Sequence, residues 1–169
     1  MSKVRIRFKG KLLTLITRKA RLPNGCRVEL EIIRHPGASL IVPFLGQDRI
    51  VLLRQLRPVI GSYIYELPAG TLGKNETPLS CARREITEET GYRAARFTRL
   101  GRIYPVPGYS TERITVYKAQ GLIKRTRNTQ RDEIIESIVV TRKEVRRLFR
   151  SGKIVDAKTI CALAFCGWL

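Results

Sequence analysis

Residues 70–92 read GTLGKNETPLSCARREITEETGY, and this stretch decides the fold class because it joins a glycine-containing loop to a well-marked helix. Thr77 can act as the N-cap, and Pro78 suits the first helical position. Gly91 is a typical helix stop because it tolerates the left-handed conformation that often ends a helix. The pattern therefore predicts a helix that begins at Pro78 and ends before Gly91.

Three glutamates share one side of this predicted helix. Glu85, Glu88 and Glu89 occupy positions i, i+3 and i+4, so they fall within a sector about 100° wide. Like charges at this spacing repel each other and destabilise an isolated helix. A solvated acidic face is one interpretation, but arginines rather than diluting lysines precede these residues. A hard divalent cation such as Mg²⁺ would neutralise them and leave coordination positions for substrate phosphates.

Strand-like runs lie on both sides of the helix. Upstream, residues 39–45, 50–57 and 63–67 are separated by turn residues, and downstream strands are expected around 94–104, 112–119 and 134–140. Helices are expected at about 143–150 and 158–169. Strands mixed with about three helices indicate an α/β fold, a sandwich layered around a mixed sheet.

The N-terminal segment forms a separate predicted unit. Residues 4–8 alternate between apolar and basic side chains, and residues 11–33 resemble a hairpin with its turn at Pro23-Asn24-Gly25. His35-Pro36-Gly37 interrupts the pattern. We therefore expect a small antiparallel β-unit over residues 1–38 and a main domain over residues 39–169.

Basic residues dominate the charge of the chain. The sequence contains 33 Lys and Arg against 14 Asp and Glu, a formal net charge of +19. Residues 1–28 contain no acid and nine basic residues: Lys3, Arg5, Arg7, Lys9, Lys11, Arg18, Lys19, Arg21 and Arg27. Such a balance favours polyanionic partners or phosphorylated substrates, although a basic, solvated surface is an equal alternative.

Composition also excludes several classes of protein. A hydrophobic fraction of 43% excludes intrinsic disorder, and the apolar runs are too short to span a bilayer. The N-terminus lacks a signal-peptide core, so we expect a soluble cytoplasmic protein with no membrane partner. The four cysteines form no CxxC pair and His35 is the single histidine, which disfavours zinc and favours buried free thiols.

The whole of residues 70–92 closely resembles the Nudix box, Gly-x5-Glu-x7-Arg-Glu-U-x-Glu-Glu-x-Gly-U, in which U is an apolar aliphatic residue. All fixed positions match, namely Gly70, Glu76, Arg84, Glu85, Glu88, Glu89 and Gly91. Tyr92, at the last U, is a mild departure. The resemblance implies a Nudix α/β/α sandwich. It also implies hydrolysis of a nucleoside diphosphate linked to another moiety, by water that a metal activates.

The flanking segments resemble the ADP-ribose pyrophosphatase subfamily. Segments 54–58 and 66–70 are similar to its approach to the box, and Pro107 lies fifteen residues beyond Tyr92, where that subfamily has a proline. The resemblance covers nearly the whole chain. It implies Mg²⁺-dependent hydrolysis of ADP-ribose, or of a related ADP-sugar, to AMP and ribose 5-phosphate, with Mn²⁺ as a substitute ion.

The resemblance also implies roles for individual residues. The expected metal ligands are the Ala69 carbonyl, Glu85 and Glu89. Expected catalytic residues are Arg84, which can pair with Glu76 or a catalytic glutamate, together with Glu88 and the base Glu133. Expected substrate-binding residues are Arg54, Arg57, Glu66, Gly108 and Glu112. Alternatives stay open for the base (Asp132, Glu136 or a box glutamate), for Glu133 as a charged loop residue, for Arg54 as a surface residue and for Gly108 as a turn.

ADP-ribose pyrophosphatases are homodimers in which the N-terminal β-unit packs across the partner, so residues 1–38 are the expected dimerisation element. Two other functions stay open. One is a Nudix pyrophosphohydrolase acting on RNA 5′ ends or dinucleoside polyphosphates, which the basic segment 1–28 motivates. The other is a non-catalytic, nucleic-acid-binding Nudix-fold protein. Nucleic acid is not favoured, since Phe8 is the single aromatic residue of that segment and a binder of polyanions gains nothing from clustered glutamates.

Overall fold

A computed structural model describes residues 4–125 and 134–169 of the chain. The strands are β1 (Val4–Lys9), β2 (Thr14–Arg21), β3 (Arg27–Arg34), β4 (Ala38–Pro43), β5 (Arg49–Arg57), β6 (Ser62–Glu66), β7 (Ala69–Thr71), β8 (Tyr92–Ile103), β9 (Ile114–Lys124) and β10 (Ile135–Thr141). The helices are α1 (Pro78–Thr90), α2 (Arg142–Arg150), α3 (Ala157–Phe165) and the short 3-10 helix η1 (Pro58–Ile60). The order of strands and helices confirms the predicted α/β class.

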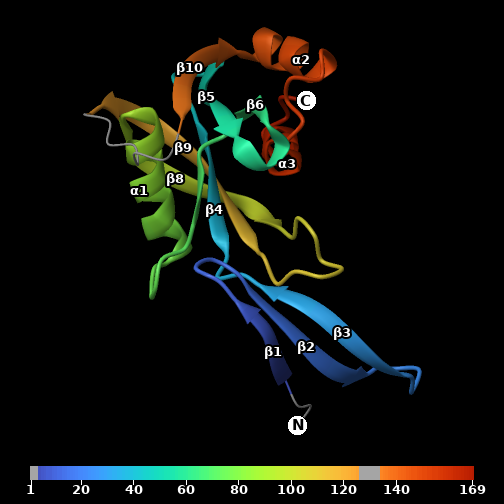
Figure 1. The fold of residues 1–169 in the computed structure, drawn as a ribbon. Coiled ribbons are helices and arrows are strands. Elements are labelled where there is room, and N and C mark those ends of the chain that lie inside the picture. The colour runs from blue at the N-terminus through green and yellow to red at the C-terminus, as the bar shows by residue number, and fades with distance from the viewer. Residues whose placement is uncertain (1–3, 126–133) are drawn as a thin grey trace.

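The main domain is built on two sheets rather than one. A four-stranded mixed sheet has the order β7-β4-β9-β8, and a three-stranded antiparallel sheet has the order β10-β5-β6. Strand β4 pairs with β9 in parallel and with β7 in the antiparallel sense. Helix α1 lies on one side of the strands and α2 and α3 lie on the other, so the domain is layered as expected for a Nudix sandwich (Figure 1).

Strand β4 explains the layering, because all six of its residues are buried. Ile41 packs in a cluster with Ala82 and Ile86 of α1, whereas Leu40 and Val42 join a larger cluster that includes residues of β5, α2 and α3. Successive side chains of a strand point to opposite faces. A continuously apolar strand therefore binds helices on both sides and holds the layers together.

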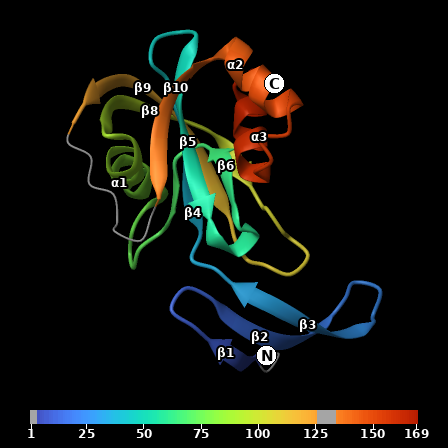
Figure 2. The same ribbon diagram turned by 45° about the horizontal axis from the view of Figure 1, so that its top comes forward.

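The N-terminal strands form a third sheet, antiparallel and in the order β1-β2-β3. This sheet projects away from the main domain (Figures 1 and 2). Backbone hydrogen bonds join it to the loop after β8: the Ile33 amide donates to the Tyr109 carbonyl at 2.7 Å, and the Thr111 amide donates to the Ile33 carbonyl at 2.9 Å. The antiparallel strands expected in the N-terminal segment are confirmed within Val4–Arg34.

Helix α1 has the ends that the sequence predicts. The Thr77 side chain accepts a hydrogen bond from the Ser80 amide at 3.2 Å, Pro78 opens the helix, and Gly91 closes it with a φ of 71°. The loop before α1 differs from expectation, because Ala69–Thr71 forms the short strand β7 against β4. This pairing places the backbone of the box loop at the edge of the mixed sheet.

Other details also depart from the sequence prediction. The last helix ends at Phe165, several residues before the expected end. Cys81 is buried as expected, but Cys26 and Cys161 are exposed free thiols and Cys166 is half-buried. Within residues 4–125 and 134–169, no helix has the length and apolar character that crossing a bilayer requires.

Candidate active site

The glutamates of α1 lie against the backbone of β7. Glu85 and Glu89 are buried, and the Ala69 amide donates a hydrogen bond to Glu89 Oε2 at 3.0 Å. A Cβ atom on Gly70 would overlap the Glu85 carboxylate, so only glycine allows this close approach. The first glycine of the motif is therefore required by packing between the loop and the helix.

Arg84 gathers three carboxylates of the motif. Its guanidinium donates to Glu76 at 3.0 and 3.1 Å, to Glu85 at 2.6 Å and to Glu88 at 3.1 Å. The hydrogen bond from Arg84 holds the pKa of Glu76 below its ordinary value, and the same hydrogen bond raises the pKa of Arg84. Arg84 thus fixes the rotamers of neighbouring acids, in agreement with the pairing expected for it.

Cys81 lies next to this cluster, beneath the loop that precedes α1. Its thiol lies 3.3 Å from the Gly70 carbonyl, to which it donates a hydrogen bond. Burial raises the pKa of Cys81 to about 11, and the nearby charge of Glu85 acts in the same direction. The thiol therefore stays protonated at neutral pH and packs beneath the loop rather than acting as a nucleophile.

The donor chemistry of this cluster fits a hard divalent cation. Glu85 and Glu89 bring two buried carboxylates, one helical turn apart, to the backbone at Ala69 and Gly70. In the part of the chain that the structure describes, no three His, Cys, Asp or Glu side chains are arranged as a metal site. Arg84 instead supplies positive charge to Glu85 and Glu88. These residues could hold the ion once the Glu85 carboxylate turns from Arg84.

A pocket of about 370 Å³ opens beside β7. Its walls come from β4, β5, β7, β9, the loop after β8 and the start of α3. They comprise Ala38, Arg57, Ala69, Gly70, Thr71, Pro105, Glu112, Ile114, Asp156, Ala157 and Lys158. Three residues expected at the site, Arg57, Ala69 and Glu112, are therefore brought together around one cavity.

Glu66 holds two cations at the wall of this pocket. Its carboxylate is only 1% exposed and accepts hydrogen bonds from Arg57 at 2.6 and 2.7 Å and from Lys158 at 2.6 Å. Burial alone would raise the pKa of Glu66, but hydrogen bonds and charge from Arg57 and Lys158 outweigh it, so the pKa is lowered. The hydrogen bond to Glu66 raises the pKa of Arg57. Glu66 thus lies behind the pocket and orients the cations that face it.

Two other residues expected at the site, Arg54 and Gly108, lie outside this pocket. Arg54 pairs with Glu136 at 3.7 Å, and its guanidinium carbon lies 4.0 Å from the centroid of the Tyr63 ring. Gly108 lines a different cavity, between the loop after β8 and the N-terminal sheet. Glu88 is half-buried beside Arg84. Glu133 and Asp132, the candidates for the base, are outside the described residues.

Sequence reasoning missed Lys158. Lys158 is far from β6 in the sequence, and helix α3 places it at the wall of the pocket. Asp156 caps α3 by accepting from the Thr159 amide at 2.9 Å, and it also binds Lys158 at 2.8 Å. Thr159 in turn accepts a hydrogen bond from the Leu67 amide at 2.9 Å. The local signal is a capping aspartate with a lysine two residues later, and this pattern does not by itself indicate a binding residue.

Comparison with known proteins agrees with this architecture. A family model described as the NUDIX domain matches residues 33–163. The chain is 35% identical over 160 residues to a Bacillus subtilis (strain 168) protein named ADP-ribose pyrophosphatase, covering 94% of this chain and 86% of the relative. It is 34% identical over 160 residues to the methanol dehydrogenase activator of Bacillus methanolicus, with the same coverage.

A solved structure supports the fold independently. The crystal structure of an ADP compounds hydrolase superposes with a TM-score of 0.83, covering 97% of this chain and 89% of that chain at 22% sequence identity. The family model covers most of the chain, and the box glutamates lie where α1 meets the edge strand β7. The chain belongs to the Nudix hydrolase family.

Proposed function

We propose that this enzyme hydrolyses the pyrophosphate bond of ADP-ribose, or of a related ADP-sugar, to AMP and ribose 5-phosphate in a Mg²⁺-dependent reaction. The observation that carries the proposal is the pocket in which Arg57 and Lys158 face the backbone of Ala69 and Gly70, next to Glu85 and Glu89. Cations on one side and metal-binding carboxylates on the other suit a diphosphate. The name of the Bacillus subtilis relative supports the same substrate class.

The residues of the pocket would bind and orient the diphosphate. Arg57 and Lys158 are held by Glu66, so their donors are fixed before the substrate arrives and little side-chain entropy is lost on binding. Arg57 has a planar guanidinium, which can bind two phosphate oxygens at once. Pro105, Ile114 and Ala38 supply the apolar part of the pocket wall.

The glutamates would hold the ion. Glu85 and Glu89, with the Ala69 carbonyl, are the proposed ligands, and Arg84 orients Glu85 and Glu88. When bound, Mg²⁺ would polarise the phosphoryl oxygens and lower the pKa of a water molecule. Hydrolysis adds the oxygen of water to one phosphorus, breaks the bond between that phosphorus and the bridging oxygen, and leaves one phosphate on each product.

A substrate panel tests this function. The purified protein is incubated with Mg²⁺ and, in separate reactions, ADP-ribose, GDP-mannose, a dinucleoside polyphosphate, RNA with a 5′-triphosphate and nucleoside triphosphates. Release of AMP and ribose 5-phosphate from ADP-ribose, at the highest kcat/KM of the panel, is the expected result. Turnover of nucleoside triphosphates or RNA alone would reject the proposal. Replacing Mg²⁺ by Mn²⁺ should retain activity, and chelation should abolish it.

We also propose that the protein is a homodimer formed through the N-terminal sheet. Every residue of β1 is exposed, and the apolar side chains of Ile6 and Phe8 are 61% and 62% exposed. Ile6 pairs with Ile16 and Phe8 with Leu15, with a register shift between them that interrupts the regular alternation of β1. A second copy of this chain would cover Ile6 and Phe8. The molecular mass in solution, measured by light scattering at two protein concentrations, should be twice that of the chain; a monomer at both concentrations would contradict the proposal.

A further inference from the structure

The face of helix α1 opposite to its buried glutamates borders a second pocket. A pocket of about 540 Å³ lies between this face and the strands β8 and β9. We call it the arginine pocket; its defining residues are Arg83 and Thr87 of α1, Arg93 and Phe97 of β8, Ile123 of β9, and Arg125. Because α1 turns about 100° per residue, Arg83 and Thr87 point away from Glu85 and Glu89. The arginine pocket is therefore separate from the candidate active site.

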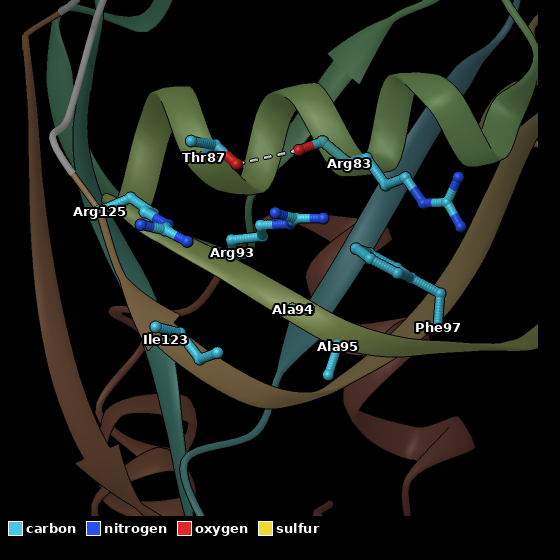
Figure 3. A pocket seen from close by; sticks show the side chains of 8 residues that line it. All are labelled: Arg83, Thr87, Arg93, Ala94, Ala95, Phe97, Ile123 and Arg125. Carbon is cyan, nitrogen blue, oxygen red and sulfur yellow. Dashed lines mark hydrogen bonds between the residues drawn. The ribbon is translucent and has the colours of Figure 1, made fainter.

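Three guanidinium groups line this pocket, and none of its lining residues within the described ranges 4–125 and 134–169 carries a carboxylate. Arg93 and Arg125 point into the same space beneath α1, and Arg83 lies farther along the helix (Figure 3). Among the described residues, none of the three forms an ion pair. The pocket arginines thus differ from Arg84, whose charge is shared by three glutamates.

One end of the pocket is aromatic. The Phe97 ring packs edge to face on Tyr117, with 6.3 Å between centroids and an interplanar angle of 84°. This contact holds the ring in one orientation, and the guanidinium carbon of Arg83 lies 6.0 Å from its centroid. A planar base could stack against such a ring and arginine. Arg93 and Arg125 lie toward the other end (Figure 3).

We propose that the arginine pocket binds a nucleotide, with the base at Phe97 and Arg83 and the phosphate at Arg93 and Arg125. The pocket volume lies within the range of roughly 300–1,000 Å³ that is typical of small-molecule sites. Two clustered guanidiniums repel each other until an anion neutralises them, and phosphate is the anion that suits their paired donors. The nucleotide can be free or can be the end of an RNA strand, since both present the same base and phosphate.

Calorimetric titrations with AMP, with inorganic phosphate and with a short 5′-phosphorylated oligoadenylate test the proposal. A chelator is present, so that no divalent cation links phosphate to the glutamates of the active site. The variants are Arg93→Ala and its matched control Arg99→Ala, another exposed arginine of β8 that does not line the pocket. Thermal unfolding of each variant verifies the fold, and Phe97→Leu serves as a second variant that keeps an apolar side chain.

AMP is expected to bind more tightly than inorganic phosphate. Arg93→Ala should lower the affinity for AMP at least tenfold, and Arg99→Ala should lower it less than twofold. Phe97→Leu should remove the preference for AMP over phosphate. An oligoadenylate that binds more tightly than AMP, and that also loses affinity in Arg93→Ala, would identify an RNA end as the source of the nucleotide. Equal weakening by Arg99→Ala, equal affinity for phosphate and AMP, or no binding of AMP and oligoadenylate would overturn the proposal.

Discussion

The box region and the N-terminal sheet are held in contrasting ways. Around α1, buried carboxylates, Arg84 and the backbone of β7 are joined by short side-chain hydrogen bonds that leave little freedom. The N-terminal sheet is joined to the main domain by backbone hydrogen bonds at Ile33 and displays apolar side chains to solvent. The contacts described for the first region are made within one chain, whereas the second has apolar side chains that nothing in the described chain covers. We therefore expect substitutions to act on chemistry in the first region and on association in the second.

The largest effect is expected from Glu89→Gln. Removing one charge from a proposed metal ligand should lower kcat/KM by on the order of a thousandfold, because the ion supplies several kcal/mol of transition-state stabilisation. Glu31→Gln, an exposed carboxylate of the N-terminal sheet, is the control and should retain full activity. Steady-state assays with ADP-ribose check this prediction. An unimpaired Glu89→Gln enzyme would remove the case for a metal at α1.

Gly70→Ala should have the next largest effect. The new methyl group would overlap the Glu85 carboxylate, so Glu85 must move from its position on β7. A misplacement of about 1 Å at a reacting centre can cost roughly a hundredfold in rate, and we expect at least that loss. Gly73→Ala is a matched control in the same loop, since its Cβ would meet Glu76 at 3.4 Å, an ordinary contact. Similar losses in both variants would show that the loop, rather than Glu85, is sensitive.

Lys158→Ala tests the residue that sequence reasoning missed. Loss of one charge-assisted contact to phosphate should raise KM about tenfold and leave kcat less affected. Lys153→Ala, an exposed lysine outside the pocket, should leave KM unchanged. Lys158→Arg should restore part of the affinity. A fall in kcat at constant KM would contradict a role in substrate binding.

Acid should weaken the Glu66 network. The pKa of Glu66 is lowered from its ordinary value of 4.5. Its contribution to the free energy of unfolding is therefore complete above about pH 5 and is lost as the pH falls through its folded pKa. Denaturant unfolding of the wild type and of Glu66→Gln from pH 7 to pH 3 measures this contribution. The difference between the two proteins should shrink below about pH 4.5; a difference independent of pH would contradict the assignment.

The smallest effect on the single chain is expected from Ile6→Lys. In a monomer, a substitution at an exposed position changes the free energy of unfolding by no more than about 0.5 kcal/mol. The same change would bury a charge in the proposed dimer and should shift the mass in solution toward that of one chain. Arg5→Ala, on the other face of β1, should leave the dimer intact. Dissociation by both variants would indicate that charge, and not the apolar face, controls association.

The sequence predictions were accurate where residues act locally on the backbone and failed where contacts are long-range. The ends of α1 could be predicted because Thr77, Pro78 and Gly91 act locally on the backbone. Helical spacing also predicted that Glu85 and Glu89 share one side of α1. Local patterns could not show that β7 pairs with β4, because a three-residue edge strand has too few residues for a periodic signal.

Long-range contacts account for the other misses. Lys158 reaches Glu66 across 92 positions of the chain, and no local pattern encodes that distance. The exposure of Cys26 and Cys161 was also missed, since a cysteine shows its burial only through its neighbours in space. The arginine pocket escaped notice for the same reason, because its side chains come from three separate stretches of sequence.

The parallel pairing of β4 with β9 affects the order in which parts of the enzyme fold. Ala38 is registered against Ile114, and both residues are walls of the candidate active site. Contacts between residues so far apart in sequence form slowly, because the intervening chain loses conformational entropy before the contacts stabilise the fold. During synthesis, β4 and α1 emerge well before β9, the strand that pairs with β4. The enzyme therefore gains its catalytic cavity late, after the last strand of the mixed sheet has left the ribosome.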